Sequence, residues 1–198
     1  MVCHGASACQ PRAAGRAVTS GLEAFATARL RAERLTAGHE AEVYRLNSDA
    51  AVMAYLGGAH DQAFTRVWME RNLRHWDEFG FGTWMLRSAD GEHVGRAVLR
   101  HLPVDGADEV EVGYAFYPPY WGRGLATEIT TACLGIAFGA LALQAIVAIT
   151  DPRNTASRHV LVKCGLAYER EFLKDGVTWA LFRTRPGEDG GRVFRPGD

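Results

Sequence analysis

A glycine-rich segment in the second half of the chain has the residue types and spacing of an anion-binding loop. It reads Gly122-Arg-Gly-Leu-Ala-Thr127 and directly precedes a predicted helix. Glycines let the backbone approach a ligand closely and adopt angles that other residues resist. The first N–H groups of a helix have no internal partners, and together with the helix dipole they attract anions such as phosphates. By itself the segment fits either an anion-binding loop or a plain structural turn.

The same glycine spacing also occurs in dinucleotide-binding loops. Those loops have a third glycine and open a β-α-β unit. Here Thr127 stands at the position of the third glycine, and Pro118-Pro-Tyr-Trp121 lengthens the turn. Asp151, after the next predicted strand, keeps this alternative open, but the departures count against it.

Side chains capable of acid–base chemistry lie on both sides of the glycine-rich segment. Glu109 and Glu111 alternate with apolar residues, so the two carboxylates share one face of a predicted strand. A carboxylate so placed can accept a proton from a reacting group. Asn154 and Ser157 open a later predicted helix, where Asn154 is suited to be the N-cap.

Histidines and cysteines show no metal-binding pattern. There is no CxxC pair, and the cysteines have no metal-ligand spacing; they are Cys3, Cys9, Cys133 and Cys164. We therefore expect free thiols in a reducing compartment and no bound metal. The histidines at 75, 101 and 159 are interpreted as surface or core residues.

Hydrophobic periodicity predicts the elements that position these residues. Strands are expected at residues 28–35, 82–88, 93–102, 109–116, 144–150, 166–172 and 177–183. Helices are expected at 36–46, 49–56, 61–79, 122–140 and 154–164. This order predicts the α/β or α+β class, a mixed and mostly antiparallel sheet of about seven strands flanked by helices. Helix 122–140 is long enough to be a parallel crossover between its neighbouring strands.

Turn residues divide the predicted sheet. Asp90-Gly91 and Asp175-Gly176 each separate two apolar runs, which predicts two-residue hairpins with positive φ at both turn positions. Residues 102–108, rich in Gly, Asp and Pro, are expected to form a loop.

The predicted helix 61–79 carries an aromatic stripe. The stripe consists of Phe64, Val67, Trp68, Trp76 and Phe79. We interpret it as core packing, with a substrate-pocket role for Trp68 or Trp76 as the alternative.

Composition places the chain among ordinary globular proteins. It has 198 residues, 47% hydrophobic and 23% charged, with a formal net charge of -1. Nothing in this balance requires a nucleic-acid or membrane partner. No apolar run has the length of a membrane span or signal peptide, so we expect a cytoplasmic protein. Residues 1–20 and 186–198 are predicted to be flexible extensions of a single domain at 21–185.

Three segments, in sequence order, resemble the GCN5-related N-acetyltransferase (GNAT) family. They are Glu111-Val-Gly-Tyr-Ala-Phe116, Tyr120-Trp-Gly-Arg-Gly-Leu-Ala-Thr-Glu128, and Asn154–Ser157 continued by Lys163-Cys-Gly-Leu166. The chain is most similar to the branch that includes ribosomal-protein N-terminal acetyltransferases, over about residues 26–184. Trp121 departs from the Gln or Arg usual in the family, and Leu166 from the usual aromatic residue.

The resemblance implies that acetyl-CoA binds between splayed ends of strands 109–116 and 144–150. Its pantetheine would pair with the backbone near Ala115 and Phe116, where an N–H would polarise the thioester carbonyl. Its pyrophosphate would lie on Gly122, Arg123, Gly124, Leu125, Ala126 and Thr127. The acceptor would be a primary amine, of a protein N-terminus or a small molecule, attacking directly in a ternary complex.

Roles for individual side chains follow from the same resemblance. Glu111 would be the general base, and Ser157 would contact the cofactor and protonate its thiolate. Asn154 would bind the pantetheine, and Tyr168 is the second choice of acid. Residues 57–79, the 102–108 loop and the last hairpin would define the acceptor. A non-catalytic acyl-CoA-binding or regulatory module is the alternative, and a monomer or homodimer is expected.

Overall fold

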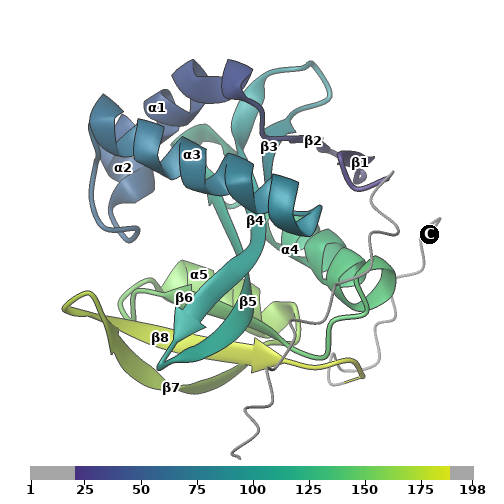
Figure 1. Cartoon of the computed structure of the whole chain (residues 1–198), viewed down its shortest axis with the longest axis vertical. Coiled ribbons are helices and arrows are strands. Elements are labelled where there is room, and N and C mark those ends of the chain that lie inside the picture. Colours follow the sequence, from purple (N-terminus) through teal and green to yellow (C-terminus); the bar gives the residue numbers. More distant parts are fainter. Residues whose placement is uncertain (1–20, 188–198) are drawn as a thin grey trace, which may run out of the picture.

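One sheet of eight strands organises the chain in the computed structural model, which describes residues 21–187 (Figure 1). The strand order is β1-β2-β3-β4-β5-β6-β8-β7. The bounds are β1 (Ala24–Ala26), β2 (Arg31–Arg34), β3 (Thr83–Arg87), β4 (His93–Val104), β5 (Ala107–Phe116), β6 (Ile146–Thr150), β7 (Ala167–Lys174) and β8 (Val177–Thr184). Every neighbouring pair is antiparallel except β5 and β6. The predicted fold class is confirmed, with β1 as an additional strand.

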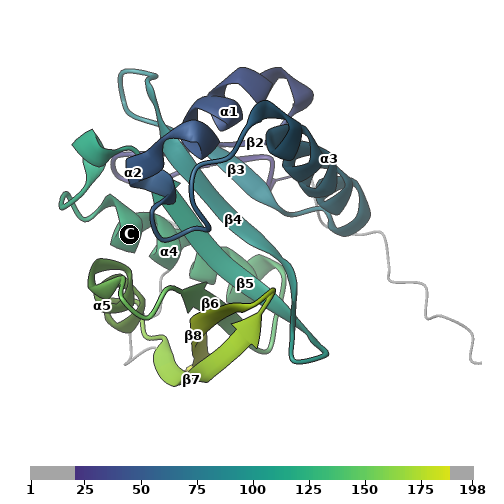
Figure 2. The same cartoon turned by 90° about the vertical axis from the view of Figure 1, so that its left-hand side faces the viewer.

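Helices cover both faces of the sheet (Figure 2). On one side lie α1 (Glu40–Ser48), α2 (Ala50–Met53) and α3 (Gln62–Phe79); on the other lie α4 (Leu125–Gly135) and α5 (Thr155–Lys163). Short helical turns occur at Ala37–His39, Pro118–Tyr120 and Ile136–Ala140. Asp49 and Asp61 cap α2 and α3 by accepting backbone N–H bonds, and Gly80 ends α3 with a φ of 73°. Asp is a preferred N-cap residue, and Gly is the preferred residue at a left-handed helix end.

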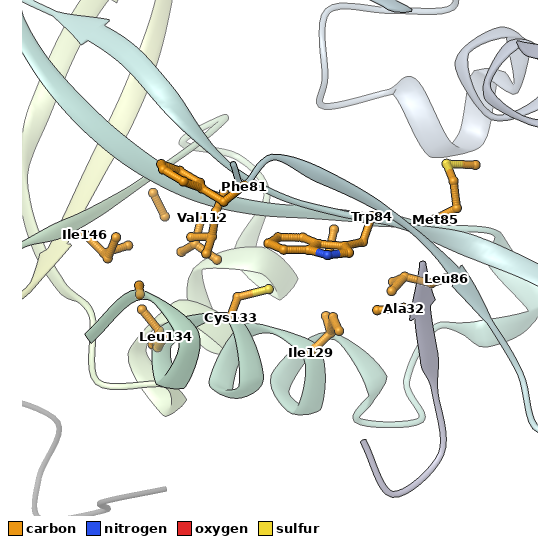
Figure 3. Close-up of a cluster of buried hydrophobic side chains, with 14 of the residues drawn as sticks. Ala32, Phe81, Trp84, Met85, Leu86, Val112, Ile129, Cys133, Leu134 and Ile146 are labelled. Atoms are coloured by element: carbon orange, nitrogen blue, oxygen red, sulfur yellow. The ribbon is translucent and has the colours of Figure 1, made fainter. Parts of the chain in front are cut away.

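The main hydrophobic core lies between the sheet and α4 (Figure 3). Trp84 of β3 is fully buried there, opposite Ile129 and Cys133 of the helix. The indole N–H of Trp84 donates to the Leu22 carbonyl at 2.7 Å, so its one polar atom is satisfied. This packing fixes α4, and with it the glycine-rich segment at its start, against the middle of the sheet.

The buried face of α3 differs from the predicted aromatic stripe. It comprises Thr65, Trp68, Met69, Asn72 and Trp76. Phe64, Val67 and Phe79 are instead exposed by 41%, 68% and 37%. Thr65 and Asn72 lie three and four residues from Trp68 and so share its face, whereas Val67 lies about 100° to the side. Phe64 and Phe79 lie near the two ends of the helix, where they stack on His60 and His101.

Three two-residue turns test the hairpin predictions. Asp175-Gly176 is confirmed, with φ of 51° and 77°. Asp105-Gly106 adopts the same geometry, with φ of 48° and 83°, so the predicted loop at 102–108 is wrong and β4 runs directly into β5. At Asp90-Gly91 only Gly91 has a positive φ, because the Ser88 side chain and backbone bind Glu92 and make the turn longer.

Two predicted elements begin later than expected. The strand predicted at 28–35 is confined to β2, because Thr27 and Leu30 hydrogen-bond across a turn. The helix predicted from Gly122 begins at Leu125, because Gly122 and Gly124 have left-handed φ of 70° and 77°. A helix cannot contain those angles, so residues 122–124 form a loop that enters it.

The sheet opens at its centre. Strands β5 and β6 are parallel, linked through α4 as predicted, and their register contains one pair, Glu111 with Val147. Beyond that pair the two strands separate, while β4 stays paired with β5 as far as Phe116. The expected splay of the central strands is thus present.

Candidate active site

A cleft with a volume of about 1260 Å³ passes through the opening between β5 and β6. Nearly all residues that the sequence singled out line this cleft: Glu111, Ala115, Phe116, Gly122, Gly124, Leu125, Ala126, Thr127, Asn154 and Ser157. They come from β5, the loop before α4, and the start of α5. The fold therefore assembles the predicted site from three separate elements.

The loop before α4 presents free backbone donors. No side chain among the described residues caps the helix, whose first N–H groups therefore remain available. A Cβ at Gly122 would meet nothing within 4 Å, so the space over the loop is open. These features fit an anion at the start of α4. The Arg123 guanidinium lies 5.5 Å from the Tyr120 ring, and Arg123 is not among the residues that line the cleft.

A brace from the turn between β1 and β2 holds this loop. Arg29 donates to the Arg123 carbonyl at 2.7 Å, and its Nε donates to the Glu128 carboxylate at 2.7 Å. The Thr27 hydroxyl and the Arg29 backbone N–H also donate to Glu128. Burial would raise the pKa of Glu128, but these hydrogen bonds outweigh burial and lower it below its ordinary value. Sequence reasoning missed Arg29, because it lies 94 positions before its partner Arg123.

The two carboxylates of β5 have separate partners. Glu111 is 4% exposed, lines the cleft, and accepts a hydrogen bond from Nε of Arg100 on the paired position of β4. Glu109 instead receives two hydrogen bonds of 2.9 Å from Arg183 of β8. Each negative charge is therefore compensated, and Glu111 is the one that faces the cleft.

Hydroxyl groups lie on the opposite wall. Asn154 Oδ1 accepts the Ser157 N–H at 3.0 Å, the helix cap expected from the sequence. The Tyr114 hydroxyl donates to Ser157 Oγ at 3.2 Å, and both residues line the cleft. Burial raises the pKa of Tyr114, so its hydroxyl keeps its proton at neutral pH. Tyr168 lies outside the cleft lining, 49% exposed, with its ring edge-on to Phe182.

The cleft continues past Glu111 along α3 and the ends of both hairpins. All three segments expected to define the acceptor contribute to its wall, through residues that include Phe64, Trp68, Arg71, Phe79, Leu102, Pro103, Asp175 and Trp179. Trp68 thus contacts the cleft, as the alternative interpretation had it, whereas Trp76 packs edge-on against Trp84 in the core.

The histidines of this region have mainly structural contacts. His75 Nε2 accepts the His101 N–H at 3.0 Å, which leaves Nδ1 to donate to the Phe81 carbonyl at 2.8 Å. His101 pairs with Asp108, and His159 is exposed on α5. Burial lowers the pKa of His75, which agrees with a neutral ring that makes one hydrogen bond at each nitrogen.

Metal and membrane features can be examined over residues 21–187. In that part of the chain no group of three His, Cys, Asp or Glu residues is arranged to hold a metal ion. None of its helices is both long and apolar enough to cross a bilayer. Cys133 and Cys164 are free thiols there, whereas Cys3, Cys9 and most of the two predicted extensions lie outside the described residues.

Comparison with known proteins agrees with this geometry. The acetyltransferase (GNAT) domain family matches residues 29–167. An uncharacterised Bacillus subtilis protein, YkkB, is 30% identical over 141 residues, which is 71% of this chain and 82% of that protein. An Agrobacterium tumefaciens acetyltransferase structure has a TM-score of 0.73 at 23% identity, covering 87% of this chain and 99% of that one. Ribosomal-protein-S5-alanine acetyltransferase from Vibrio fischeri has a TM-score of 0.68 at 16% identity, covering 84% and 98%. The chain therefore belongs to the GNAT family and is an acetyl-CoA-dependent N-acetyltransferase.

Proposed function

We propose that the chain transfers the acetyl group of acetyl-CoA to a primary amine that enters the cleft from the side of α3. One observation carries this proposal. The unpaired edge of β5 beyond Glu111 and the uncapped start of α4 line the same cleft. A strand edge can pair with an extended amide chain, and a helix start can bind phosphates. In CoA, the pantetheine is the extended amide chain and the pyrophosphate follows it. This arrangement matches the strand edge followed by the helix start and favours CoA over a dinucleotide.

Strand alternation supports Phe116 as the residue that polarises the thioester. The Tyr117 N–H donates to Val94 of β4. Since backbone groups alternate along a strand, the N–H groups of Tyr114 and Phe116 point away from β4, toward the gap beside β6. The Phe116 carbonyl already accepts the Trp121 indole N–H at 2.7 Å. The Phe116 N–H is then the donor available for the carbonyl oxygen of acetyl-CoA, and Ala115 contributes to the wall.

Protons move through two groups in this proposal. Glu111 takes a proton from the acceptor ammonium group, directly or through one water molecule, which frees the nitrogen lone pair for attack. Ser157, backed by the Tyr114 hydroxyl, donates a proton to the departing thiolate. Asn154 fixes the start of α5 and so the position of Ser157.

The proposed phosphate loop is tested with acetyl-CoA and thermal unfolding. A ligand at about 100 times its Kd stabilises the folded state by about 2.7 kcal/mol, which corresponds to roughly 5–10 °C for a domain of this size. We expect this shift for the wild type. Gly124→Asp should abolish it, because a carboxylate would lie against the phosphates at a position where φ is already left-handed.

Gly91→Asp is the matched control. Gly91 also has a positive φ, of 84°, and open space around its Cα, but it belongs to the β3–β4 turn. This variant should lose some stability and keep the full acetyl-CoA shift. A full shift in Gly124→Asp would disprove the loop's role. Stabilisation by NAD and not by CoA would favour the dinucleotide alternative, and CoA binding without acetylation of any amine would favour a non-catalytic module.

A further inference from the structure

The acceptor half of the cleft has more positive than negative charge on its inner wall. Arg96 and Arg100 are four residues apart on β4, so their side chains leave the sheet on the same face, and Arg71 of α3 covers that face. Glu111 is the carboxylate among them, and Arg100 already binds it. Arg71 and Arg100 therefore share one carboxylate, and Arg96 has none of its own.

Arg96 is a buried cation without an acidic partner. Its residue is 7% exposed, and its guanidinium lies 4.4 Å from the Trp68 ring centre and donates to Asn47 Oδ1 at 2.6 Å. No carboxylate in residues 21–187 pairs with it. Burial, assisted by the nearby Arg100, lowers the pKa of Arg96 to about 9. Buried arginines are normally paired with an acid, and this one lines a cleft.

Arg71 is also without a counter-charge of its own. Across the described part of the chain it has no hydrogen bond or ion pair, although it lines the cleft beside Arg100 and Glu111. Arg71 is exposed to solvent at the cleft, and partial desolvation together with Arg100 lowers the pKa of Arg71, while Glu111 acts in the opposite direction. The five N–H donors of this guanidinium are available to a ligand.

The outer part of the cleft does not cancel this excess. Arg74, Glu78, Lys174 and Asp175 also line the cleft and together contribute no net charge, and Lys174 pairs with Asp175. The inner wall would repel a polyamine, which carries several ammonium groups, and would attract an anion. A guanidinium binds a carboxylate through two parallel hydrogen bonds, which also fixes its orientation.

We propose that the acceptor is an amino acid, an amine with a carboxylate in the same small molecule, and that Arg71 and Arg96 bind this carboxylate. The inference rests on the acetyl transfer proposed above and names its substrate class. The acceptor nitrogen forms a bond to the acetyl carbon as the carbon–sulfur bond breaks. One ammonium proton passes to Glu111 and from there to solvent. As the carbon–sulfur bond breaks, Ser157 donates a proton to the thiolate, and the second proton lost by the nitrogen restores the Ser157 hydroxyl through water. The products are an N-acetyl amino acid and CoA.

Matched acceptor pairs test this assignment. Glycine, β-alanine, γ-aminobutyrate, phenylalanine and glutamate are each compared with their carboxamides, by following release of free CoA. For at least one pair we expect kcat/KM to be about tenfold or more higher for the acid, the range of one charge-assisted hydrogen-bonded pair. Arg71→Gln should remove this preference by lowering kcat/KM for the acid alone, and Arg71→Lys should keep part of it.

Arg66→Gln is the control variant. Arg66 lies on α3 and pairs with Glu40, outside the lining of the cleft, so the acid preference should be unchanged. Equal kcat/KM values for the acids and their carboxamides overturn the inference. An equal fall in kcat/KM for acids and carboxamides in Arg71→Gln also overturns it. Faster acetylation of spermidine or of a peptide amide than of every acid also overturns it, but leaves acetyl transfer intact. If acetyl-CoA neither binds nor reacts, the proposed function itself fails.

Discussion

At the scale of single residues, β5 places one carboxylate and one hydroxyl group on its opposite faces. Glu111 and Tyr114 are three positions apart, so one faces α3 and Arg100 while the other faces α5 and Ser157. The free edge of the strand lies between them. A thioester bound along that edge would have a base on one side for the incoming ammonium group and a donor on the other for the sulfur.

Glu111→Gln tests the base. The amide keeps the shape and can still bind Arg100 but accepts no proton, so kcat should fall about 10²–10⁴-fold with little change in acetyl-CoA affinity. Steady-state rates with a saturating amine give this comparison. Glu109→Gln, on the same strand face but bound to Arg183, should retain near wild-type kcat. Equal activity of Glu111→Gln and wild type would mean that Glu111 is structural.

Ser157→Ala tests the proton donor. Without the hydroxyl, the thiolate leaves unprotonated or draws on Tyr114 through a longer path, so we expect kcat to fall about tenfold or more. The fall in kcat should be smaller with an acetyl thioester whose thiol is more acidic than that of CoA, because its thiolate leaves without protonation. The comparison is made above neutral pH. Thr155→Ala, two residues earlier on α5 and outside the cleft lining, is the control. A rise in the KM for acetyl-CoA with an unchanged kcat would mean that Ser157 contributes to binding only.

At the scale of elements, the start of α4 depends on the turn between β1 and β2. Arg29 and Thr27 together hold Glu128, which stands in the first turn of α4, beside the proposed pyrophosphate site. A carboxylate there would repel phosphates if it were unpaired. The brace therefore neutralises Glu128 and fixes the loop backbone through the Arg123 carbonyl.

Arg29→Gln should weaken acetyl-CoA binding while the fold persists. The Glu128 charge would be exposed to the phosphates, and the loop would lose its hydrogen bond, so we expect Kd to rise about tenfold. Isothermal calorimetry measures this, and the defect should decrease at high salt. Arg34→Gln, in the adjacent strand and paired with Glu23 and Asp77, should leave Kd unchanged. An unchanged Kd in Arg29→Gln would show that the brace has no part in binding.

At the scale of the whole molecule, buried histidines make stability depend on pH. Burial lowers the pKa of both His75 and His93. His93 Nδ1 is buried without a hydrogen bond to the described residues, so its neutral form is favoured. The unfolded chain then takes up protons near pH 6.5 before the folded protein does. By linkage, the free energy of unfolding is highest above pH 6.5 and decreases as the pH falls through the lowered pKa values.

Thermal unfolding between pH 8 and pH 5 should therefore show Tm falling below about pH 6.5, the ordinary histidine pKa. His75→Gln, which cannot take up a proton, should have a lower Tm at pH 8 but a shallower decline toward pH 5. His159→Gln, exposed on α5, is the control and should follow the wild type. A slope identical to wild type in His75→Gln would contradict the assignment.

Local pattern accounts for much of the fold. Alternation along β5, the caps at Asp49, Asp61 and Asn154, and the glycine at the end of α3 are all set by residues close in sequence. The structure differs from the sequence prediction where two short-range patterns favour different structures. The segment 102–108 contains a proline and a two-residue turn, and the turn geometry prevailed because both flanking strands pair without a break.

The sequence by itself determined the family and the class of fold, and it predicted the loop proposed to bind phosphate, because these depend on short motifs and on the period of apolar residues. Only the tertiary structure decided which side chains face one another. Arg29 meets Glu128 and Arg123, and Tyr114 meets Ser157. Arg71 and Arg100 lie near Glu111, and Arg96 stacks on Trp68. These contacts join residues from different strands and helices. Their distances are set by the packing of α3, α4 and α5 on the sheet, which no local pattern encodes.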